Sequence, residues 1–274
     1  MEQKTIWSET SIGVSDAQLP LLAAFLCEIF QNEMFSAKYL DWLYNKNPFG
    51  NAVCITVYSE NQIIGHIAGL PREYSNGFEG SYKGFLAVNT SVDRKFLKLR
   101  IFNDLIKALI NEKDSRGYEF ILGIPNRNAL NGWLKRGKAL YLGKLNLYFS
   151  LFIFPIPSNK ILTFTKQNEM QIWLSNDPFH KRKSGDFILN SKFIFFPFWF
   201  FSIISFLNKD GSYSNSSRSL IFGFIGKEPP KTPALRLPDF LKPAPLHVIL
   251  IAEKQEVFSF FSKTEIQAKD FDAL

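Results

Sequence analysis

Apolar residues recur every three or four positions near the start of the chain, which predicts two consecutive helices. The first is expected between Ala17 and Phe30, where six apolar side chains fall on one helical face. After Ser36, a residue suited to cap a helix, the same spacing continues to Tyr44. The segment 47–50 ends this second helix, because a proline keeps the residue before it out of helical geometry.

Alternating apolar and polar residues follow, and this pattern predicts strands. The elements expected after residue 52 are, in chain order, strands at 53–57, 63–70 and 85–92, a helix at 99–114, a strand at 120–124, a helix at 129–136 and a strand region at 139–154. A helix that joins two neighbouring parallel strands forms a right-handed crossover. The order therefore predicts an α+β fold with a mixed, mainly antiparallel sheet flanked by helices.

The pattern becomes less regular after Pro157, so a domain boundary is expected there. Residues 1–157 would form the first domain, and residues 158–274 a second, smaller α+β lobe. Beyond a proline-rich stretch, the chain offers two closing strands, at 246–252 and 257–261.

Phenylalanine is unusually frequent, with 29 copies, and many of them crowd into residues 193–207. This apolar run of 15 residues contains Pro197 and is shorter than the roughly 20 residues that a spanning helix needs. It is therefore read as a buried core segment, and contact with a membrane surface is the alternative.

Charge and cysteine content exclude several classes of protein. The formal net charge of +7 is spread over both halves of the chain, which does not indicate a nucleic-acid partner. Cys27 and Cys54 have no CxxC partner, and the three histidines are widely separated, so neither a disulfide framework nor a metal site is expected. No apolar segment suited to a secretory signal appears before Glu9, and the expected compartment is the cytoplasm.

Common phosphate-loop, dinucleotide, zinc-protease and serine-hydrolase motifs are absent from the sequence. Two gap-free stretches instead resemble the GNAT superfamily of acyl-CoA-dependent N-acyltransferases. Residues 92–105 lie on the family pattern V-x-P-x-Y-R-G-x-G-I-G-x-x-L, with fits at Val92, Phe96, Ile101 and Leu105. The later family pattern N-x-x-A-x-x-x-Y-x-x-x-G falls on Asn126, Ala129, Trp133 and Gly137.

The resemblance covers about residues 8–150 and includes features that precede these two stretches. Trp42, the segment 47–50, Gly65 and Pro71 look like the opening of a bacterial branch of the superfamily. More faintly, the end of the chain looks like the degenerate second half of tandem relatives. The fold implied is the GNAT-like mixed sheet.

The resemblance also implies a site for acetyl-CoA or another acyl-CoA. The cofactor-binding positions that it implies are Thr90, Val92, Leu97, Lys98, Leu99, Arg100, Ile101, Phe102, Asn126 and Ala129. Family glycines, whose backbone amides hold a pyrophosphate, are replaced here by Lys98 and Arg100. Two cations in these places would hold phosphates through charge-assisted hydrogen bonds instead.

A second departure concerns the family tyrosine beside the leaving thiolate, because Trp133 stands in its place. An indole N–H is no useful proton source near neutral pH, so Trp133 is expected to form a wall. Candidate bases for the incoming amine are Glu73, Glu79 and Tyr82, all near strands that should border the acceptor site. Between Glu119 and Glu169 the chain has seven cations and no acid, which would attract a phosphate or an anionic acceptor.

The sequence thus favours an acyl-CoA-dependent N-acyltransferase that acylates a primary amine on a small metabolite or a polysaccharide precursor. The alternative is a non-catalytic GNAT-like protein that binds or scaffolds through a degenerate cofactor loop. A protein that interacts with a membrane surface is a third class.

Overall fold

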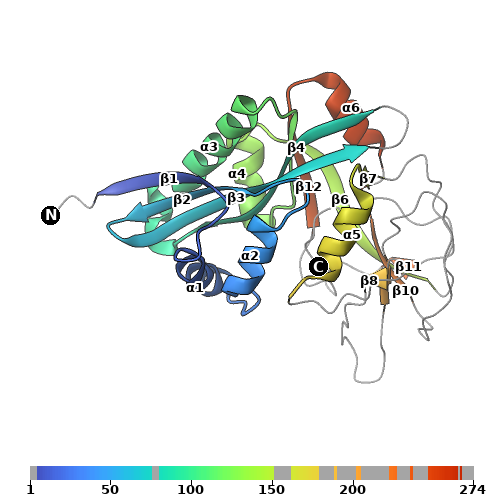
Figure 1. The fold of residues 1–274 in the computed structure, drawn as a ribbon. Coiled ribbons are helices and arrows are strands. Elements are labelled where there is room, and N and C mark those ends of the chain that lie inside the picture. Colours follow the sequence, from blue (N-terminus) through green and yellow to red (C-terminus); the bar gives the residue numbers. More distant parts are fainter. Residues whose placement is uncertain are drawn as a thin grey trace.

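The computed structural model describes residues 5–75, 80–150, 162–178 and 246–264, together with residue 266 and four short strand segments (Figure 1). The first part of the chain contains β1 (Ile6–Ile12), α1 (Leu19–Phe30), α2 (Ala37–Asn45), β2 (Val53–Ser59), β3 (Gln62–Ser75), β4 (Ser81–Val92), a 3₁₀ helix η1 (Arg94–Leu99), α3 (Ile101–Ser115), β5 (Phe120–Gly123), α4 (Arg127–Arg136) and β6 (Leu140–Ser150). The later elements are β7 (Thr163–Phe164), α5 (Gln167–Ser175), β8 (Ile188–Leu189), β9 (Ser202–Ile204), β10 (Phe222–Gly226), β11 (Leu235–Arg236), β12 (Leu246–Ala252) and α6 (Gln255–Lys263).

The strands form one mixed sheet in the order β1-β2-β3-β4-β5-β12-β6-β10-β9-β8, with β7 paired to β3 and β11 paired to β6. Two of the described pairings are parallel, β4 with β5 and β9 with β10, and the others are antiparallel. Helices lie on both faces of the sheet (Figure 1). The expected α+β class, with a mainly antiparallel sheet flanked by helices, is confirmed.

Each face of the sheet has its own apolar core, as the alternation along a strand requires. On β5, Phe120 and Leu122 join the core under α1, α2, α5 and α6, whereas Ile121 joins the core under α3 and α4. β12 repeats this arrangement, with Leu250 on the first face and Ile249 on the second. Both faces of the central strands are therefore covered.

Local signals in the sequence correspond well to the elements at the start of the chain. The Ser36 hydroxyl accepts a hydrogen bond from the Tyr39 backbone N–H at 3.2 Å and caps α2, as expected. The turn at Glu60 and Asn61 joins β2 to β3, and the Glu60 φ of 58° lies in the left-handed region. The expected helix at 99–114 begins at Ile101, because a 3₁₀ turn occupies the residues before it.

One expected strand is wrong. Residues 257–261 belong to the helix α6, in which Val257, Phe260 and Phe261 are buried on one face. The spacing of these three residues is i, i+3 and i+4, which fits a helix and not the period of two in a strand.

Segments from both sides of residue 157 share one sheet and one core. β12 lies between β5 and β6 and is antiparallel to both, so that Leu250 pairs with Leu122 on one side and Leu140 on the other. α5 packs on α2 through Trp173 and Trp42. The described part of the chain after residue 157 therefore completes the fold of the part before it.

The apolar run 193–207 lies outside the described residues, apart from its three residues in β9. Within the described segments, no helix combines the length and the apolar character needed to cross a bilayer.

Candidate functional site

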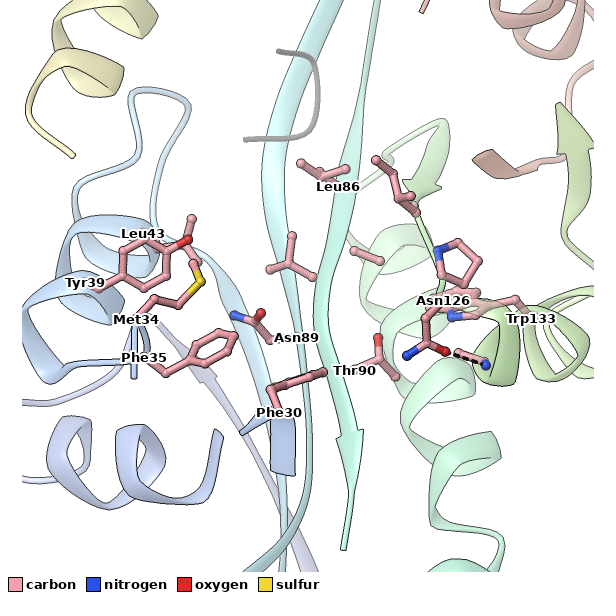
Figure 2. A pocket seen from close by; sticks show the side chains of 16 residues that line it. Phe30, Met34, Phe35, Tyr39, Leu43, Leu86, Asn89, Thr90, Asn126 and Trp133 are labelled. Carbon is pink, nitrogen blue, oxygen red and sulfur yellow. Dashed lines mark hydrogen bonds between the residues drawn. The ribbon is translucent and has the colours of Figure 1, made fainter. Parts of the chain in front are cut away.

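A cavity of about 340 Å³ lies where β4 and β5 part from one another (Figure 2). The two parallel strands pair from Gly84 opposite Phe120 to Ala87 opposite Gly123. β5 ends there and the chain turns into α4, whereas β4 continues beside β3 as far as Val92. The separation leaves one edge of β4 open toward the cavity.

A β-bulge in β4 shapes the floor of this cavity. His66 pairs with Ser91 and Ala68 pairs with Val88, so Asn89 and Thr90 together stand opposite one residue of β3. Asn89 has a φ of 53°, a left-handed conformation that asparagine tolerates better than most residues. Asn89 lies on the side of α1 and α2, and Thr90 lies toward α4 (Figure 2).

The cavity has two walls of different character. The first is formed by the end of α1, the loop after it and α2, through Phe30, Met34, Phe35, Tyr39 and Leu43. The second is formed by α4, through Asn126, Ala129 and Trp133. Residues 86–90 and 123–125 complete the lining. None of the described lining residues has a carboxylate, amine, guanidinium or imidazole side chain, so the site is uncharged.

The start of α4 is fixed by Asn126, whose side-chain oxygen accepts a hydrogen bond from the Ala129 backbone N–H at 2.9 Å. Two turns further on, the Trp133 indole is 2% exposed and belongs to the core beneath α3 and α4. It also lines the cavity, where it closes the α4 side with an apolar ring. Asn126, Ala129, Trp133 and Thr90, all expected in the site, thus meet around one cavity.

A buried chain of polar side chains leads from the cavity into the sheet. The Asn89 Nδ2 atom donates to the Tyr44 hydroxyl at 2.6 Å, which lies 3.3 Å from His66 Nε2. His66 Nδ1 lies 3.0 Å from the hydroxyl of Thr56, its cross-strand partner. Burial lowers the pKa of His66 to about 3 and raises the pKa of Tyr44 well above its ordinary value. Both side chains are therefore neutral near pH 7.

The sequence analysis did not predict this series of hydrogen-bonded side chains. Its visible signal is an asparagine inside a strand, since asparagine is depleted in strands and accepts left-handed backbone geometry.

The expected cofactor positions at the start of α3 divide into a buried set and an exposed set. Ile101 is 4% exposed, and Val92 and Phe102 pack against the same core. Phe102 fits against α4 because residue 132 is a glycine, whose added Cβ would lie 2.3 Å from the ring. These three residues stabilise the contact of α3 with its neighbours and do not line the cavity.

The exposed set comprises Leu97, Lys98, Leu99 and Arg100. Arg100 precedes α3 with a φ of 59°, and no side chain caps this helix. A glycine adopts this conformation without strain, which gives a physical reason for the family glycine at this place. Lys98 and Arg100 are thus solvent-accessible at a helix N-terminus that no side chain caps.

Two of the three candidate bases, Glu73 and Tyr82, lie away from the cavity lining. Glu73 accepts a hydrogen bond from the Ser81 hydroxyl at 2.8 Å and lies 3.8 Å from the Lys83 amine. Tyr82 packs against Phe260, with ring centroids 4.8 Å apart. Neither residue lines the cavity. The third candidate, Glu79, lies outside the described residues.

Part of the acid-free stretch gathers near the start of α4. Burial, Lys144 and Arg127 together lower the pKa of His247, whose Nδ1 atom lies 3.1 Å from the Tyr141 hydroxyl. Lys144 and Arg127 therefore both lie close enough to His247 to disfavour its charged form.

In the described segments, no group of three His, Cys, Asp or Glu side chains is arranged to hold a metal ion.

No protein-family model matches the chain, and no curated protein is significantly similar to it. Among solved structures, a probable N-acyltransferase from Enterococcus faecalis is 9% identical, with a TM-score of 0.45 over 53% of this chain and 34% of that one. A GNAT family N-acetyltransferase from Escherichia coli in complex with CoA is 15% identical, with a TM-score of 0.39 over 48% of this chain and 71% of that one.

An aminoglycoside acetyltransferase from an uncultured soil metagenomic sample is 18% identical, with a TM-score of 0.39 over 48% of this chain and 86% of that one. Each of these matches covers about half of this chain. The chain spans only about a third of the length of the Enterococcus protein.

Proposed function

We propose that this chain is an acyl-CoA-dependent N-acyltransferase that transfers an acetyl or other small acyl group to a primary amine. The observation that carries the proposal is the cavity at the point where the parallel strands β4 and β5 separate. Beyond Ala87, β4 has lost its β5 partner, so its backbone groups on that edge can pair with an extended ligand. The amide-bearing arm of coenzyme A is such a ligand.

The residues around the cavity fit this coenzyme. Ala129 leaves room on the α4 wall, and Trp133 offers an apolar ring beside the thioester end. Lys98 and Arg100 would hold the phosphates at the N-terminus of α3, where the helix dipole also favours negative charge. Asp104 in the first turn of α3 adds a negative charge near this helix end, and the positive charges of Lys98 and Arg100 would offset it.

When bound, acyl-CoA supplies a thioester whose thiolate leaves readily. The chain itself binds and orients the acceptor in the cavity. The amine nitrogen forms a bond to the carbonyl carbon as the carbon–sulfur bond breaks, and the proton lost by nitrogen balances the one gained by the thiolate. No described lining side chain is a carboxylate or an imidazole, so the proposal has the amine enter as the neutral base, with its ammonium proton left in water.

Calorimetry with coenzyme A tests the proposal directly. We expect saturable binding, and we expect Ala129→Phe to abolish it by filling the cavity beside α4. Asn128→Phe is the matched control, since Asn128 is exposed on the same helix and does not line the cavity. No binding at millimolar coenzyme A overturns the proposal. Binding without transfer from acetyl-CoA to any amine of a broad panel favours the non-catalytic alternative.

A further inference from the structure

The cavity wall formed by the end of α1, the loop after it and α2 is a continuous apolar surface, and under the proposed function it would face the acceptor. Phe30 and Phe35 stack with ring centroids 5.2 Å apart, and Phe35 meets Tyr39 edge to face at 6.2 Å. Met34 and Leu43 extend the same wall. Phe35, Tyr39 and Leu43 are each at most 7% exposed, so this wall is part of the core.

The described lining residues carry no charge, which limits the kind of amine that the cavity can bind. A polycationic amine that enters the cavity loses water from several ammonium groups, and it recovers that cost only beside carboxylates. The described lining residues include no carboxylate. The wall instead gains free energy from contact with an aromatic or aliphatic group.

Asn89 supplies an oriented hydrogen-bond acceptor on this apolar side. Its Nδ2 atom is committed to the Tyr44 hydroxyl at 2.6 Å. With the His66 tautomer that is protonated at Nδ1, that hydroxyl donates to Nε2 and Nδ1 donates to the Thr56 hydroxyl, so each group has one consistent role. The amide oxygen of Asn89 is the atom left for a ligand, on a side chain that lines the same cavity as Met34 and Phe35 (Figure 2).

We infer that the acceptor is a primary amine carried on an aromatic or aliphatic group, and that Asn89 Oδ1 accepts a hydrogen bond from its N–H. The inference rests on the proposed transfer and specifies its second substrate. An uncharged amide oxygen stabilises the ammonium form of the amine less than a carboxylate would, and the reaction requires the neutral amine. Tyr44 acts through Asn89 and is a positioning residue.

The test compares two amines of opposite character with acetyl-CoA as donor. Thiol release and the mass of the product are measured with 2-phenylethylamine and with spermidine, and coenzyme A binding is measured separately by calorimetry. We expect kcat/KM to be at least tenfold higher for 2-phenylethylamine. If coenzyme A binds and spermidine is the equal or better acceptor, or neither amine is acylated, the acceptor inference is overturned while coenzyme binding stands. If coenzyme A does not bind, the proposed function falls and the inference falls with it.

Variants at Asn89 test the oxygen itself. Asn89→Gly removes the side chain and keeps the left-handed backbone free of strain, so the protein is expected to fold. The KM for 2-phenylethylamine should rise at least tenfold with the affinity for coenzyme A unchanged. Asn89→Asp places a charge at the same atoms, holds the amine as ammonium and should move the rise in rate to higher pH. An unchanged KM in Asn89→Gly, or an unchanged pH profile in Asn89→Asp, contradicts the assignment.

Tyr44→Phe tests the positioning role. Without the hydroxyl, the Asn89 amide is free to rotate, and the KM for the amine should rise while the affinity for coenzyme A stays constant. A variant whose losses appear only as lowered thermal stability shows that the chain from Tyr44 to Thr56 is structural alone.

Discussion

The indole N–H of Trp42 donates to the backbone carbonyl of Trp173 at 2.8 Å, and the indole N–H of Trp173 donates to the carbonyl of Trp42 at 3.0 Å. The rings stack with centroids 4.2 Å apart and planes 10° from parallel. Both residues are buried, at 4% and 5% exposed. This reciprocal pair fastens α5 to α2 across 131 positions of sequence.

Replacing either indole should therefore destabilise the whole domain. Trp42→Phe keeps a ring but removes the indole donor from the Trp173 carbonyl, which keeps the Asn176 backbone N–H at 3.1 Å, so the lost hydrogen bond should cost about 0.5–1.5 kcal/mol. Urea denaturation of both single variants and the double variant should give a coupling energy above roughly 0.5 kcal/mol. Trp7→Phe is the matched control, because Trp7 also stacks and donates but is 44% exposed. Equal losses at Trp7 and Trp42 would contradict this account.

Sequence periodicity predicted the helices α1 and α2 and the hairpin of β2 and β3, because the determinants of these elements are local. The role of the segment 47–50 was not predictable beyond its helix stop. The Asn47 side chain donates to the Pro71 carbonyl and accepts from the buried Arg72, and both partners belong to β3. Such contacts depend on how distant segments meet.

The same limit applies to the sheet and the site. The place of β12 between β5 and β6 joins residues more than 100 positions apart, and no local pattern specifies that pairing. Asn126, Ala129 and Trp133 were expected in the site from the resemblance of residues 126–137 to a family pattern, and all three line the cavity. Asn89 was missed, because one extra residue in a ladder redirects its side chain without changing the apolar pattern.

The parallel pairing of β4 and β5 requires a glycine at one point. A Cβ at Gly84 would lie 2.3 Å from the Phe120 carbonyl oxygen, a backbone atom that cannot move alone. Gly84→Ala should therefore cost about 1–3 kcal/mol or more. Gly123→Ala is the control on the partner strand, since its Cβ meets only ordinary contacts from 3.4 Å outward. Thermal unfolding should separate the two variants, and similar melting temperatures would refute the prediction.

His66 should make the protein sensitive to mild acid. Its folded pKa of about 3 lies below the unfolded value near 6.5, so between these pH values the unfolded chain binds the extra proton. The stability that neutral His66 contributes is therefore complete above pH 6.5. Below that pH, the free energy of unfolding falls by roughly 1 kcal/mol per pH unit as the pH drops toward 3.

Urea denaturation at several pH values measures this slope. His66→Gln removes the titration and should flatten the profile between pH 6.5 and 4. His247→Gln should change it less, because His247 is only partly buried. An unaltered slope in His66→Gln would show that other groups cause the acid sensitivity.

Trp133 should act as a wall and not as an acid. Trp133→Phe keeps most of the apolar contact and should retain coenzyme A binding and most turnover. Trp133→Ala should cost about 3–5 kcal/mol of stability, because the indole is buried. If Trp133→Phe abolishes turnover in a folded protein that still binds coenzyme A, the indole N–H is essential and the wall role is wrong.

Arg100 allows the two ways of holding a phosphate to be separated. Its φ of 59° suits a glycine, so Arg100→Gly relieves about 1 kcal/mol of backbone strain and removes one cation. If the guanidinium holds the phosphates of coenzyme A, this variant should bind at least fivefold more weakly, and the affinity should depend less on salt. If backbone amides alone hold them, the added freedom should leave the affinity unchanged or raise it.

Lys138→Gly is the matched control for Arg100→Gly. Lys138 is an exposed cation with a φ of 52°, beyond the end of α4, and it does not line the cavity. Its loss relieves similar strain and lowers the net charge by the same amount. Calorimetry at two salt concentrations should therefore show weaker, less salt-dependent binding in Arg100→Gly and parental binding in Lys138→Gly. Parallel behaviour of the two variants would mean that only the overall charge of the protein matters, and that Arg100 does not replace the family glycine as a phosphate ligand.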